Sequence, residues 1–541
     1  MSGTTNSAPF ALTGRVVTMN TAGDVLDHGA IYGRDGSIVD VRPAADKPPA
    51  GFEHVPRVAT RGTLFPGLIE LHNHLPYDVL GLWQVPKAYE NRDQWSGPST
   101  PDYHRLITGP LAVLGADPAL VAAVVRYVEV RCLLAGTTTS QGVTLSSAPG
   151  IVKHFRGLVR NVESTGDPDL PPAATHIADV DADDAQRFLA RISTGQKMIL
   201  HLAEGLSTNE VAHNHFAALE FSPGQWAITA NLVGIHCVGL TDADFAVMAA
   251  HGAGMVWSPL SNLLLYGQTA NLGAARAAGV PVALGSDWAP SGSKNLLGEL
   301  KVAQLAASLA GADDVTDADL VAMATRTPAS LLGWDTQLGS LEAGKRADLL
   351  VVAATTGNPY TRLVDATEAD LRLVMIDGIP RMGSPTLMAH LGVGPGSETI
   401  RVKRQARMLN LAQADADPDV EKVTVAEAIS RLTQALHDLP NASANPPRAR
   451  TARPAGRIRL AVNGLVDNNM TPRPHLPLHG QLTGPNLPAT RTLTAARTVA
   501  AAAGPLPVLT LDPLTAADNP TYYATLQAEP NLPDTIKASL P

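Results

Sequence analysis

Leu64-Phe65-Pro66-Gly67-Leu68-Ile69-Glu70-Leu71-His72-Asn73-His74 is an apolar run that ends in two histidines separated by one residue. Side chains two residues apart on an extended chain project from the same face of a strand. Such a strand end directs two imidazoles toward one point, and imidazole is a common protein ligand for ions such as zinc. Because histidine pairs this close also arise by accident, the pair alone is only weak support for a metal site.

Three further apolar runs end in side chains of the same chemical kinds. One run ends in His201, and Glu204 follows three residues later. A second run ends in His236, and a third is followed by Asp287. Four strand ends therefore carry residues typical of metal binding or acid–base catalysis, which strengthens the hypothesis of a metal site.

Short apolar runs alternate with helical stretches through the middle of the chain. This alternation predicts parallel strands joined by helical crossovers. The eight predicted strands are the run that ends at His72 and residues 136–143, 155–162, 173–180, 197–201, 231–236, 254–257 and 281–285. Eight such strands predict an α/β fold with a closed (β/α)8, TIM-like barrel, in which catalytic residues lie at the carboxyl ends of the strands.

The segments on either side of this barrel predict a second, smaller domain. Residues 1–63 contain short strands punctuated by glycine, and residues 336–399 again alternate strands with turns. We expect these two segments to form one composite β-sandwich beside a barrel of residues 64–335.

Residues 400–541 form a Pro- and Ala-rich extension with one or more helices, one of them beginning at a capping box of Thr424 and Glu427. The extension either wraps the barrel or a partner subunit, or is mostly disordered. No catalytic signature lies in it. Since every candidate ligand precedes it, we expect its truncation to leave metal binding unchanged.

Composition is that of an ordinary globular enzyme. The 541 residues are 45% hydrophobic and 17% charged, enough for a large core and more than one domain. A net charge of 41 minus 50, or −9, argues against nucleic acid as a partner. Two cysteines, Cys132 and Cys237, are too few for a disulfide framework or a thiolate zinc site.

The sequence predicts neither a signal peptide nor a membrane-spanning helix. Residues 1–10 lack the basic and apolar regions of a signal peptide. Residues 111–135 are interrupted by charges, which predicts an amphipathic helix rather than a membrane span. We therefore expect a soluble, cytoplasmic enzyme with no membrane partner.

The motifs and their order resemble the amidohydrolase superfamily, specifically its metal-dependent aminohydrolases: the cytosine, guanine and S-adenosylhomocysteine deaminases and the triazine chlorohydrolases. The resemblance covers about residues 10–395. It rests on His72-Asn73-His74 after Pro66-Gly67, His201-Leu202-Ala203-Glu204, His236, Ser258-Pro259-Leu260-Ser261-Asn262, Gly285-Ser286-Asp287 and Gly344-Lys345-Arg346-Ala347-Asp348-Leu349.

The resemblance implies a distorted barrel with one divalent metal ion bound by His72, His74, His201 and Asp287. Zinc is the first choice, and iron or manganese stays open because three histidines and one aspartate accept several ions. A related branch bridges two metals with a carboxylated lysine on the fourth strand. Residues 173–180 contain no lysine, which favours one metal, although Glu163 or His176 could contribute.

Ligand chemistry and resemblance together predict a hydrolase that uses a metal-activated water, whose pKa falls from 15.7 toward about 7. Asp287 would accept the proton of the water, and Glu204 would pass it to a ring nitrogen or leaving group. His236 would orient the nucleophile or stabilise developing negative charge, or would itself bind the metal. Alternatively, Glu204 only caps the following helix.

Aromatic residues gather after the first histidines, in a chain with only 4% aromatic residues. Loops after barrel strands form the pocket wall, and an aromatic wall suits a flat heterocycle, although the same residues could form the core under a long lid. Lys294 would anchor an anionic substituent or pair with Glu299. The loop aromatics are Tyr77, Trp83, Tyr89 and Trp95, and the predicted substrate contacts are Tyr77, Trp83, Asn262, Trp288 and Lys294.

The expected reaction is removal of ammonia from an amino-substituted heterocycle. The alternatives are hydrolysis of a cyclic amide or urea-like C–N bond, hydrolysis of a C–Cl or C–S bond, and a scaffold that has lost catalysis. Retention of all four predicted ligands with Glu204 and His236 disfavours the scaffold. The expected partners are a small-molecule substrate and a second copy of the chain in a homodimer.

Overall fold

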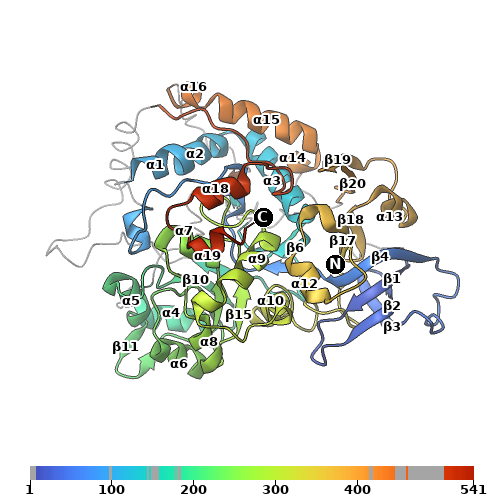
Figure 1. Cartoon of the computed structure of the whole chain (residues 1–541), viewed down its shortest axis with the longest axis horizontal. Helices are drawn as coiled ribbons and strands as arrows, with labels where there is room; N and C mark the ends of the chain where they lie inside the picture. The colour runs from blue at the N-terminus through green and yellow to red at the C-terminus, as the bar shows by residue number, and fades with distance from the viewer. Residues whose placement is uncertain are drawn as a thin grey trace.

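The computed structural model describes residues 8–96, 100–142, 145–147, 157–176, 180, 184–413, 418–444, 458–460 and 505–540. Three predicted strands, 136–143, 155–162 and 173–180, lie partly outside these residues, and so does most of the Pro-rich part of the extension. Figure 1 shows the N-terminal strands in blue at one side of the molecule and the C-terminal helices in red beside the central elements.

Among the described residues, eight short parallel strands form two sheets in the middle of the chain. The first sheet has the order β5-β6-β8 and holds β5 (Leu68–Glu70), β6 (Thr137–Ser140) and β8 (Arg160–Asn161). The second has the order β15-β14-β13-β10-β9 and holds β9 (Ala174–His176), β10 (Met198–Leu202), β13 (Leu232–His236), β14 (Gly254–Trp257) and β15 (Val282–Leu284). Each strand overlaps one that the sequence predicts.

The two parallel sheets approach each other at both edges. Beyond β5 and β15, the N–H of His74 donates to the carbonyl of Asp287 at 2.7 Å, and the N–H of Asp287 donates to the carbonyl of His72 at 3.0 Å. At the other edge, the N–H of Ala173 donates to the carbonyl of Val162 at 3.0 Å. The described strands thus show an α/β fold, but their ladders do not by themselves close into the expected barrel.

Helices connect and cover these strands, and local signals set their ends. α6 begins at a capping box of Thr241 and Asp244, and α7 ends at Gly267, whose φ of 65° favours glycine. The helices of this region are α3 (Pro118–Leu134), α4 (Ala185–Ile192), α5 (Glu210–Ala217), α6 (Asp242–Ala250), α7 (Pro259–Tyr266), α8 (Leu272–Ala278), α9 (Leu296–Ala306), α10 (Asp317–Met323) and α11 (Arg326–Leu332).

The prediction of one amphipathic helix over residues 111–135 is wrong in two respects. The segment forms α2 (Gly109–Ala116) and α3, and Asp117 between them caps α3 by accepting the N–H of Ala119 at 2.9 Å. In addition, every residue from Val121 to Leu134 is buried, charged side chains included, because their charges find partners inside the protein. In the described part of the chain, no single helix is long and apolar enough to cross a membrane. One pair of helical segments, Pro101–Ala116 and Pro118–Leu134, reaches that length and hydropathy together, but the pair is bent by 118°.

The segments before and after the parallel strands form one mixed nine-stranded sheet, of order β19-β20-β18-β17-β16-β4-β1-β2-β3, where the sequence predicts a sandwich. It joins the two segments as predicted and continues to Leu409, beyond the predicted boundary at residue 399. Its strands are β1 (Phe10–Val17), β2 (Val25–Arg34), β3 (Ser37–Pro43), β4 (Arg57–Pro66), β16 (Leu349–Val352), β17 (Leu371–Ile376), β18 (Ile379–Gly383), β19 (Glu398–Val402) and β20 (Gln405–Leu409).

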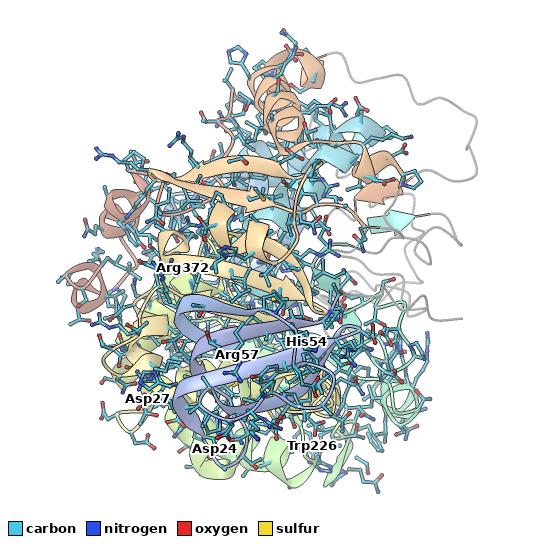
Figure 2. The ribbon with its side chains drawn as sticks, turned by 90° about the vertical axis from the view of Figure 1, so that its right-hand side faces the viewer. Asp24, Asp27, His54, Arg57, Trp226 and Arg372 are labelled. Carbon is cyan, nitrogen blue, oxygen red and sulfur yellow. The ribbon has the colours of Figure 1, made fainter. Side chains whose placement is uncertain are left out.

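This sheet fixes the start of the strand that carries the first histidines. β4 pairs with β1 and β16, and the chain passes through Gly67 directly into β5. A Cβ atom at Gly67 would lie 2.3 Å from Oγ1 of Thr138, so only glycine fits this close approach. Figure 2 shows the blue strands, with Arg57, beside the orange strands of the later segment, where Arg372 lies.

The extension packs onto the rest of the protein. α15 begins at the predicted cap, where Thr424 accepts the N–H of Glu427 at 3.1 Å, and it packs against α3. Residues 505–540 return to the central loops, where the N–H of Asp512 donates to the carbonyl of Val79 at 3.1 Å. Of the two alternatives for the extension, wrapping holds for its described residues. Its helices are α14 (Pro418–Glu421), α15 (Val425–His437), α16 (Leu439–Ala444), α18 (Tyr522–Ala528) and α19 (Asp534–Lys537).

Candidate metal centre

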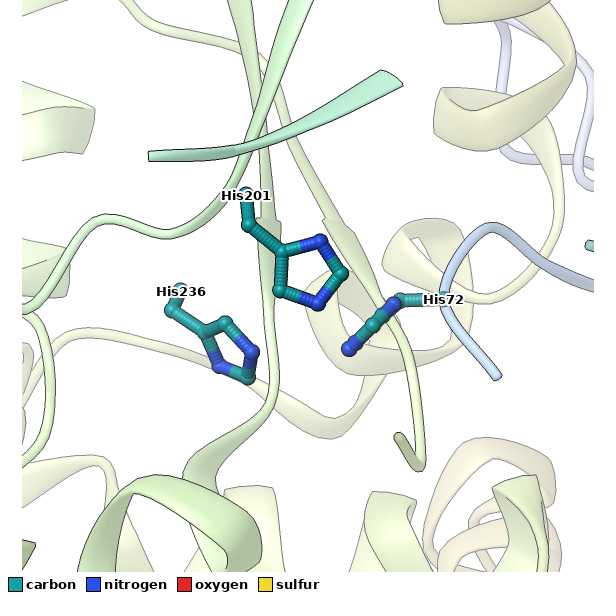
Figure 3. A group of neighbouring side chains, drawn as sticks. All are labelled: His72, His201 and His236. Carbon is teal, nitrogen blue, oxygen red and sulfur yellow. The ribbon is translucent and has the colours of Figure 1, made fainter. Parts of the chain in front are cut away.

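Three buried histidine rings meet where the parallel strands end. His72 lies just beyond β5, His201 lies in β10 and His236 is the last residue of β13. The ring centroid of His72 is 4.8 Å from that of His201 and 5.0 Å from that of His236. Their candidate ligand nitrogens all lie within 4.8 Å of one another, and Figure 3 shows the three side chains converging from separate segments.

A second group of candidate ligands shares His72 with the first. Oδ1 of Asp287 lies 3.0 Å from Nε2 of His72 and 3.5 Å from Nε2 of His74. The ligand atoms of these three residues also lie within 4.8 Å of one another. The ring of His74 stacks on that of His201 at 5.4 Å, so the two groups adjoin. The structure thus brings together all four predicted ligands and His236.

The chemistry of this donor set fits a divalent cation. The His72 side chain is fully buried; its Nε2 faces Oδ1 of Asp287 at 3.0 Å, and among the described residues its Nδ1 has no hydrogen-bond partner. A buried polar atom without a partner is costly, and a metal ion would supply that partner. Imidazole nitrogen and carboxylate oxygen are the donors that zinc takes in proteins.

The protonation states also suit a cation. Burial lowers the pKa of His74 to about 3, and nearby His72 acts in the same direction. Burial likewise lowers the pKa of His201 and of His236. Burial alone would raise the pKa of Asp287, but the neighbouring histidines, His72 foremost, hold it below its ordinary value. The site thus presents neutral imidazoles at His74, His201 and His236 and an ionised carboxylate at Asp287, which are the metal-binding forms.

Two of these residues have strained backbones. His236 has a φ of 66° and Asp287 a φ of 65°, in the left-handed region that non-glycine residues rarely adopt. Such strain costs about 1–3 kcal/mol per residue and persists where the surrounding structure enforces it, often at functional sites. The sequence gives no signal of this strain.

The N-terminal half of α7 supports both strained residues. The hydroxyl of Ser261 donates to Oδ2 of Asp287 at 2.6 Å. Nδ1 of His236 and Oδ1 of Asn262 are 2.8 Å apart and form a hydrogen bond. Asn262, a predicted substrate contact, is fully buried and lies against His236, whereas sequence reasoning assigned no role to Ser261 although it lies in the same motif.

Glu204 lies just beyond β10, close to the histidines. Tyr266 donates its hydroxyl proton to Oε1 of Glu204 at 2.6 Å, and Nε2 of His236 lies 3.9 Å from the same oxygen. Burial raises the pKa of Glu204, opposed by His236, by Arg92 and by the bond from Tyr266. Within the described residues Oε2 has no hydrogen-bond partner, so this carboxyl group can take up and release a proton beside the histidines.

The following helix does not depend on Glu204. Asn209 caps α5 by accepting the N–H of Ala212 at 3.1 Å, so the alternative role of Glu204 as its cap is wrong. Sequence reasoning missed Tyr266, which lies at the end of α7 among apolar residues, and Arg92, whose Nη1 lies 3.9 Å from Oε2 of Glu204. Neither lies in a recognisable motif, and only the fold brings them to Glu204.

The predicted aromatic residues form one buried cluster next to His74. The ring of Trp288 lies 5.8 Å from that of His74, 5.0 Å from that of Tyr77 and 6.0 Å from that of Trp95. The cluster continues from Trp95 to Trp83, at 6.4 Å. From Trp83 it reaches Tyr89, and Tyr103, which sequence reasoning did not identify, lies between Trp83 and Trp95.

Two other predicted residues have partners of their own. The ammonium group of Lys294 pairs with the carboxylate of Asp512 and donates to the carbonyl of Pro513 at 3.1 Å, so Glu299 is not its partner. Glu163 accepts the N–H of Gly142 at 3.0 Å and belongs to neither candidate ligand group. The side chain of His176 lies outside the described residues.

Comparison with known proteins agrees with this geometry. Residues 171–380 match the Amidohydrolase family. The chain is 25% identical over 404 residues to the 5-methylthioadenosine/S-adenosylhomocysteine deaminase of Symbiobacterium thermophilum, covering 68% of this chain and 91% of that protein. It is 29% identical over 388 residues to an imidazolonepropionase of Xanthomonas campestris, covering 62% of this chain and 90% of that protein.

A crystal structure of an adenosine deaminase from Xanthomonas campestris with bound zinc has the same fold, with a TM-score of 0.57 and 22% sequence identity over 79% of this chain and 97% of that one. The family and sequence matches show a hydrolase that acts on C–N bonds, and the structure adds a histidine cluster that could hold a metal ion. The predicted resemblance to the amidohydrolase family is thus confirmed over residues 171–380.

Proposed function

We propose that this protein is a metal-dependent deaminase that removes ammonia from an amino-substituted heterocycle. The observation that carries the proposal is the position of Glu204 beside the histidine cluster: it is a buried carboxyl group whose Oε2 has no hydrogen-bond partner among the described residues. The deaminase relatives support the same reaction.

The proposed ligands are His72, His74, His201 and Asp287, and zinc is the proposed ion. A divalent ion there would act as a Lewis acid and make water nucleophilic at neutral pH. The geometry supports this choice of ligands. His72, His74 and Asp287 form one candidate group, and the ring of His201 stacks on that of His74. Zinc in the structural relative from Xanthomonas campestris supports the choice of ion.

The remaining residues handle protons and orientation. Asp287, ionised and held by Ser261, would accept a proton from the attacking water. Glu204 would carry a proton at Oε2 to a ring nitrogen of the heterocycle or to the leaving amine. His236 would orient the nucleophile; with Asn262 accepting its Nδ1 proton, Nε2 presents a lone pair toward the cluster, which also makes His236 an alternative ligand.

The architecture proposed for this chemistry is a single (β/α)8 barrel made of both parallel sheets. Support comes from the backbone hydrogen bonds that connect residues 72–74 to Asp287 at one edge and Val162 to Ala173 at the other. In that arrangement all proposed ligands lie at one end of the barrel, as barrel enzymes require.

The proposed substrate is a flat heterocycle that stacks on the aromatic cluster of Tyr77, Trp83, Trp95 and Trp288. These rings adjoin His74, and stacking on aromatic faces suits a planar ring. Hydrolysis of a cyclic amide or urea-like C–N bond is the second candidate. The chain is about as similar to the imidazolonepropionase of Xanthomonas campestris, which is not named as a deaminase, as to the deaminase relative. An assay of ammonia release over amino-purines, pyrimidines and triazines distinguishes the two.

Metal content per chain is the first test. Protein purified without added metal or a metal-binding tag should contain about one zinc per chain by plasma mass spectrometry. His72→Ala and His201→Ala should lose it, whereas His54→Ala, which alters an exposed histidine, should retain it. Two metals per chain would favour a dinuclear amide hydrolase. No metal even after zinc is supplied, or no ammonia from any compound of the panel, would reject the proposed function.

The expectations about partners and location stay predictions. A homodimer is the proposed assembly and can be checked by light scattering on the purified protein. Cytoplasmic location and the absence of nucleic acid and membrane partners rest on composition and charge.

A further inference from the structure

A charged cluster lies buried between the C-terminal segment and the loops of the candidate metal centre. It contains Asp512 from the extension, Arg131 from α3 and Lys294 from the loop before α9, all less than 7% exposed. Nη1 of Arg131 donates to Oδ2 of Asp512 at 2.8 Å, and the ammonium of Lys294 bonds the same oxygen. The hydroxyl of Tyr127 also bonds the backbone carbonyl of Asp512.

The same arginine connects this cluster to both loops that carry proposed ligands. Arg131 donates to the carbonyl of Asp78 at 2.6 Å, and Oδ1 of Asp78 accepts the N–H of Ala289 at 2.8 Å. Asp78 follows His74 by four residues, and Ala289 follows Asp287 by two. Arg131 also donates twice to the carbonyl of Lys294, at 2.9 and 2.7 Å.

We propose that Asp512 is a positioning residue for the metal centre, and that the C-terminal segment is therefore part of the enzyme's active architecture. Asp512 acts through Arg131, which holds the loops after β5 and β15 in register. The proposal rests on the proposed function insofar as those loops bind the metal. It also reverses the expectation that truncation of the extension leaves metal binding unchanged.

The charges explain why Asp512 is needed. Arg131 and Lys294 are two neighbouring buried cations, and a buried charge without its partner is strongly destabilising. Burial and the nearby Arg131 lower the pKa of Lys294 to about 8, while Asp512 opposes this shift. Without this carboxylate the two cations repel each other, with Asp78 as the remaining acid that acts on Arg131, and Arg131 would relax by moving the loops that it holds. Ligand geometry tolerates displacements of only about 0.5 Å.

The test compares Asp512→Asn with Asp534→Asn in the full-length chain. Asp534 lies in the same segment, but its side chain is fully exposed. Asp512→Asn should lose zinc to a chelator about tenfold faster or more, as for other residues that orient metal ligands, and should change the visible absorption bands of the cobalt-substituted protein. Asp534→Asn should match the wild type in both. Wild-type zinc loss and cobalt bands in Asp512→Asn would overturn the proposal.

Hydrogen exchange separates this proposal from the proposed function. In Asp512→Asn, amides of residues 72–80 and 287–296 should exchange about tenfold faster, with strands of the mixed sheet unchanged. If the wild type binds no metal, the proposed function is rejected. The role of Asp512 in positioning the two loops is then decided by their hydrogen exchange alone. If Asp512→Asn does not fold, Asp512→Asn/Lys294→Met carries the same exchange test: it removes one charge of each sign but still leaves Arg131 without the Asp512 carboxylate, so unchanged loops in it would reject the proposal.

Discussion

The hydroxyl of Tyr266 donates a 2.6 Å hydrogen bond to Oε1 of Glu204, and its oxygen accepts the indole N–H of Trp95 at 3.0 Å. Trp95 belongs to the aromatic cluster beside His74, so one chain of hydrogen bonds links the proposed substrate wall to the proposed proton carrier. A substrate that moves Trp95 would thereby act on the position of Glu204.

Replacing Tyr266 by phenylalanine should lower kcat by about tenfold or more, because a hydrogen bond to a charged group is worth about 1.5–3 kcal/mol. Metal content should stay at the wild-type value, since Tyr266 lies in neither candidate ligand group. Steady-state kinetics beside metal analysis check this. Tyr32→Phe is the matched control, because Tyr32 is equally buried but lies in the mixed sheet and its hydroxyl has no hydrogen-bond partner among the described residues.

The substitution Glu204→Gln should keep the metal and lose about 100-fold or more of kcat, the usual contribution of a positioned acid or base. Glutamine preserves the size of the side chain and can still accept the bond from Tyr266, so the change is confined to proton transfer. Ammonia release and metal content of the same preparation provide the measurement. Turnover at the wild-type rate would exclude Glu204 as the proton carrier.

Asp287→Ala should abolish turnover even in preparations that retain some metal, because Asp287 is proposed both as ligand and as proton acceptor. Ser261→Ala should have a smaller effect, about tenfold in kcat, because it removes only the hydrogen bond to Oδ2. Kinetics normalised to bound metal separate the two roles. Full activity per bound metal in Asp287→Ala would restrict Asp287 to a ligand at most.

Replacing Asn262 by alanine tests the position of His236. Loss of the acceptor at 2.8 Å frees the ring of His236, and kcat should fall about tenfold while one metal per chain is retained. The measurement pairs kinetics with metal content. Metal loss as complete as in His72→Ala would instead place His236 among the ligands.

The strands and candidate ligands of this site could be predicted because their signals are local. Each parallel strand is a short apolar run, and His72, His201, His236 and Asp287 each lie at or just beyond the end of one. Strand direction then determines which ends meet, so the pattern predicts that these side chains come together, while the choice of ligands among them follows from the family resemblance.

The supporting residues could not be predicted, because their contacts join distant parts of the chain. Tyr266 reaches Glu204 across 62 residues, and Asp512 reaches Arg131 across 381. The charges in α3 illustrate the same limit: Arg126 and Arg131 suggest an exposed helix face, yet partners from the extension allow both to be buried. Contacts between residues far apart in the chain produce no periodic pattern in the sequence, so they could not be predicted from it.

Glu129 on α3 predicts a specific dependence of stability on pH. It is buried, accepts the N–H of Leu158, and burial raises its pKa to about 7 against the opposing effect of Arg126. Between pH 4.5, its ordinary pKa, and pH 7 the folded protein holds a proton that the unfolded chain releases, so the free energy of unfolding falls as pH rises through this window and levels off above it. With 1.36 kcal/mol for each pKa unit, the loss is about 3 kcal/mol at most.

Glu129→Gln removes this titration while it keeps an acceptor for Leu158. The variant should therefore gain stability relative to the wild type as pH rises from 5 to 8, measured by urea unfolding at each pH. Glu421→Gln, at an exposed position of α14, should follow the wild type at every pH. Parallel pH curves for Glu129→Gln and the wild type would show that Glu129 stays ionised in the folded protein, and that Arg126 outweighs burial at this position.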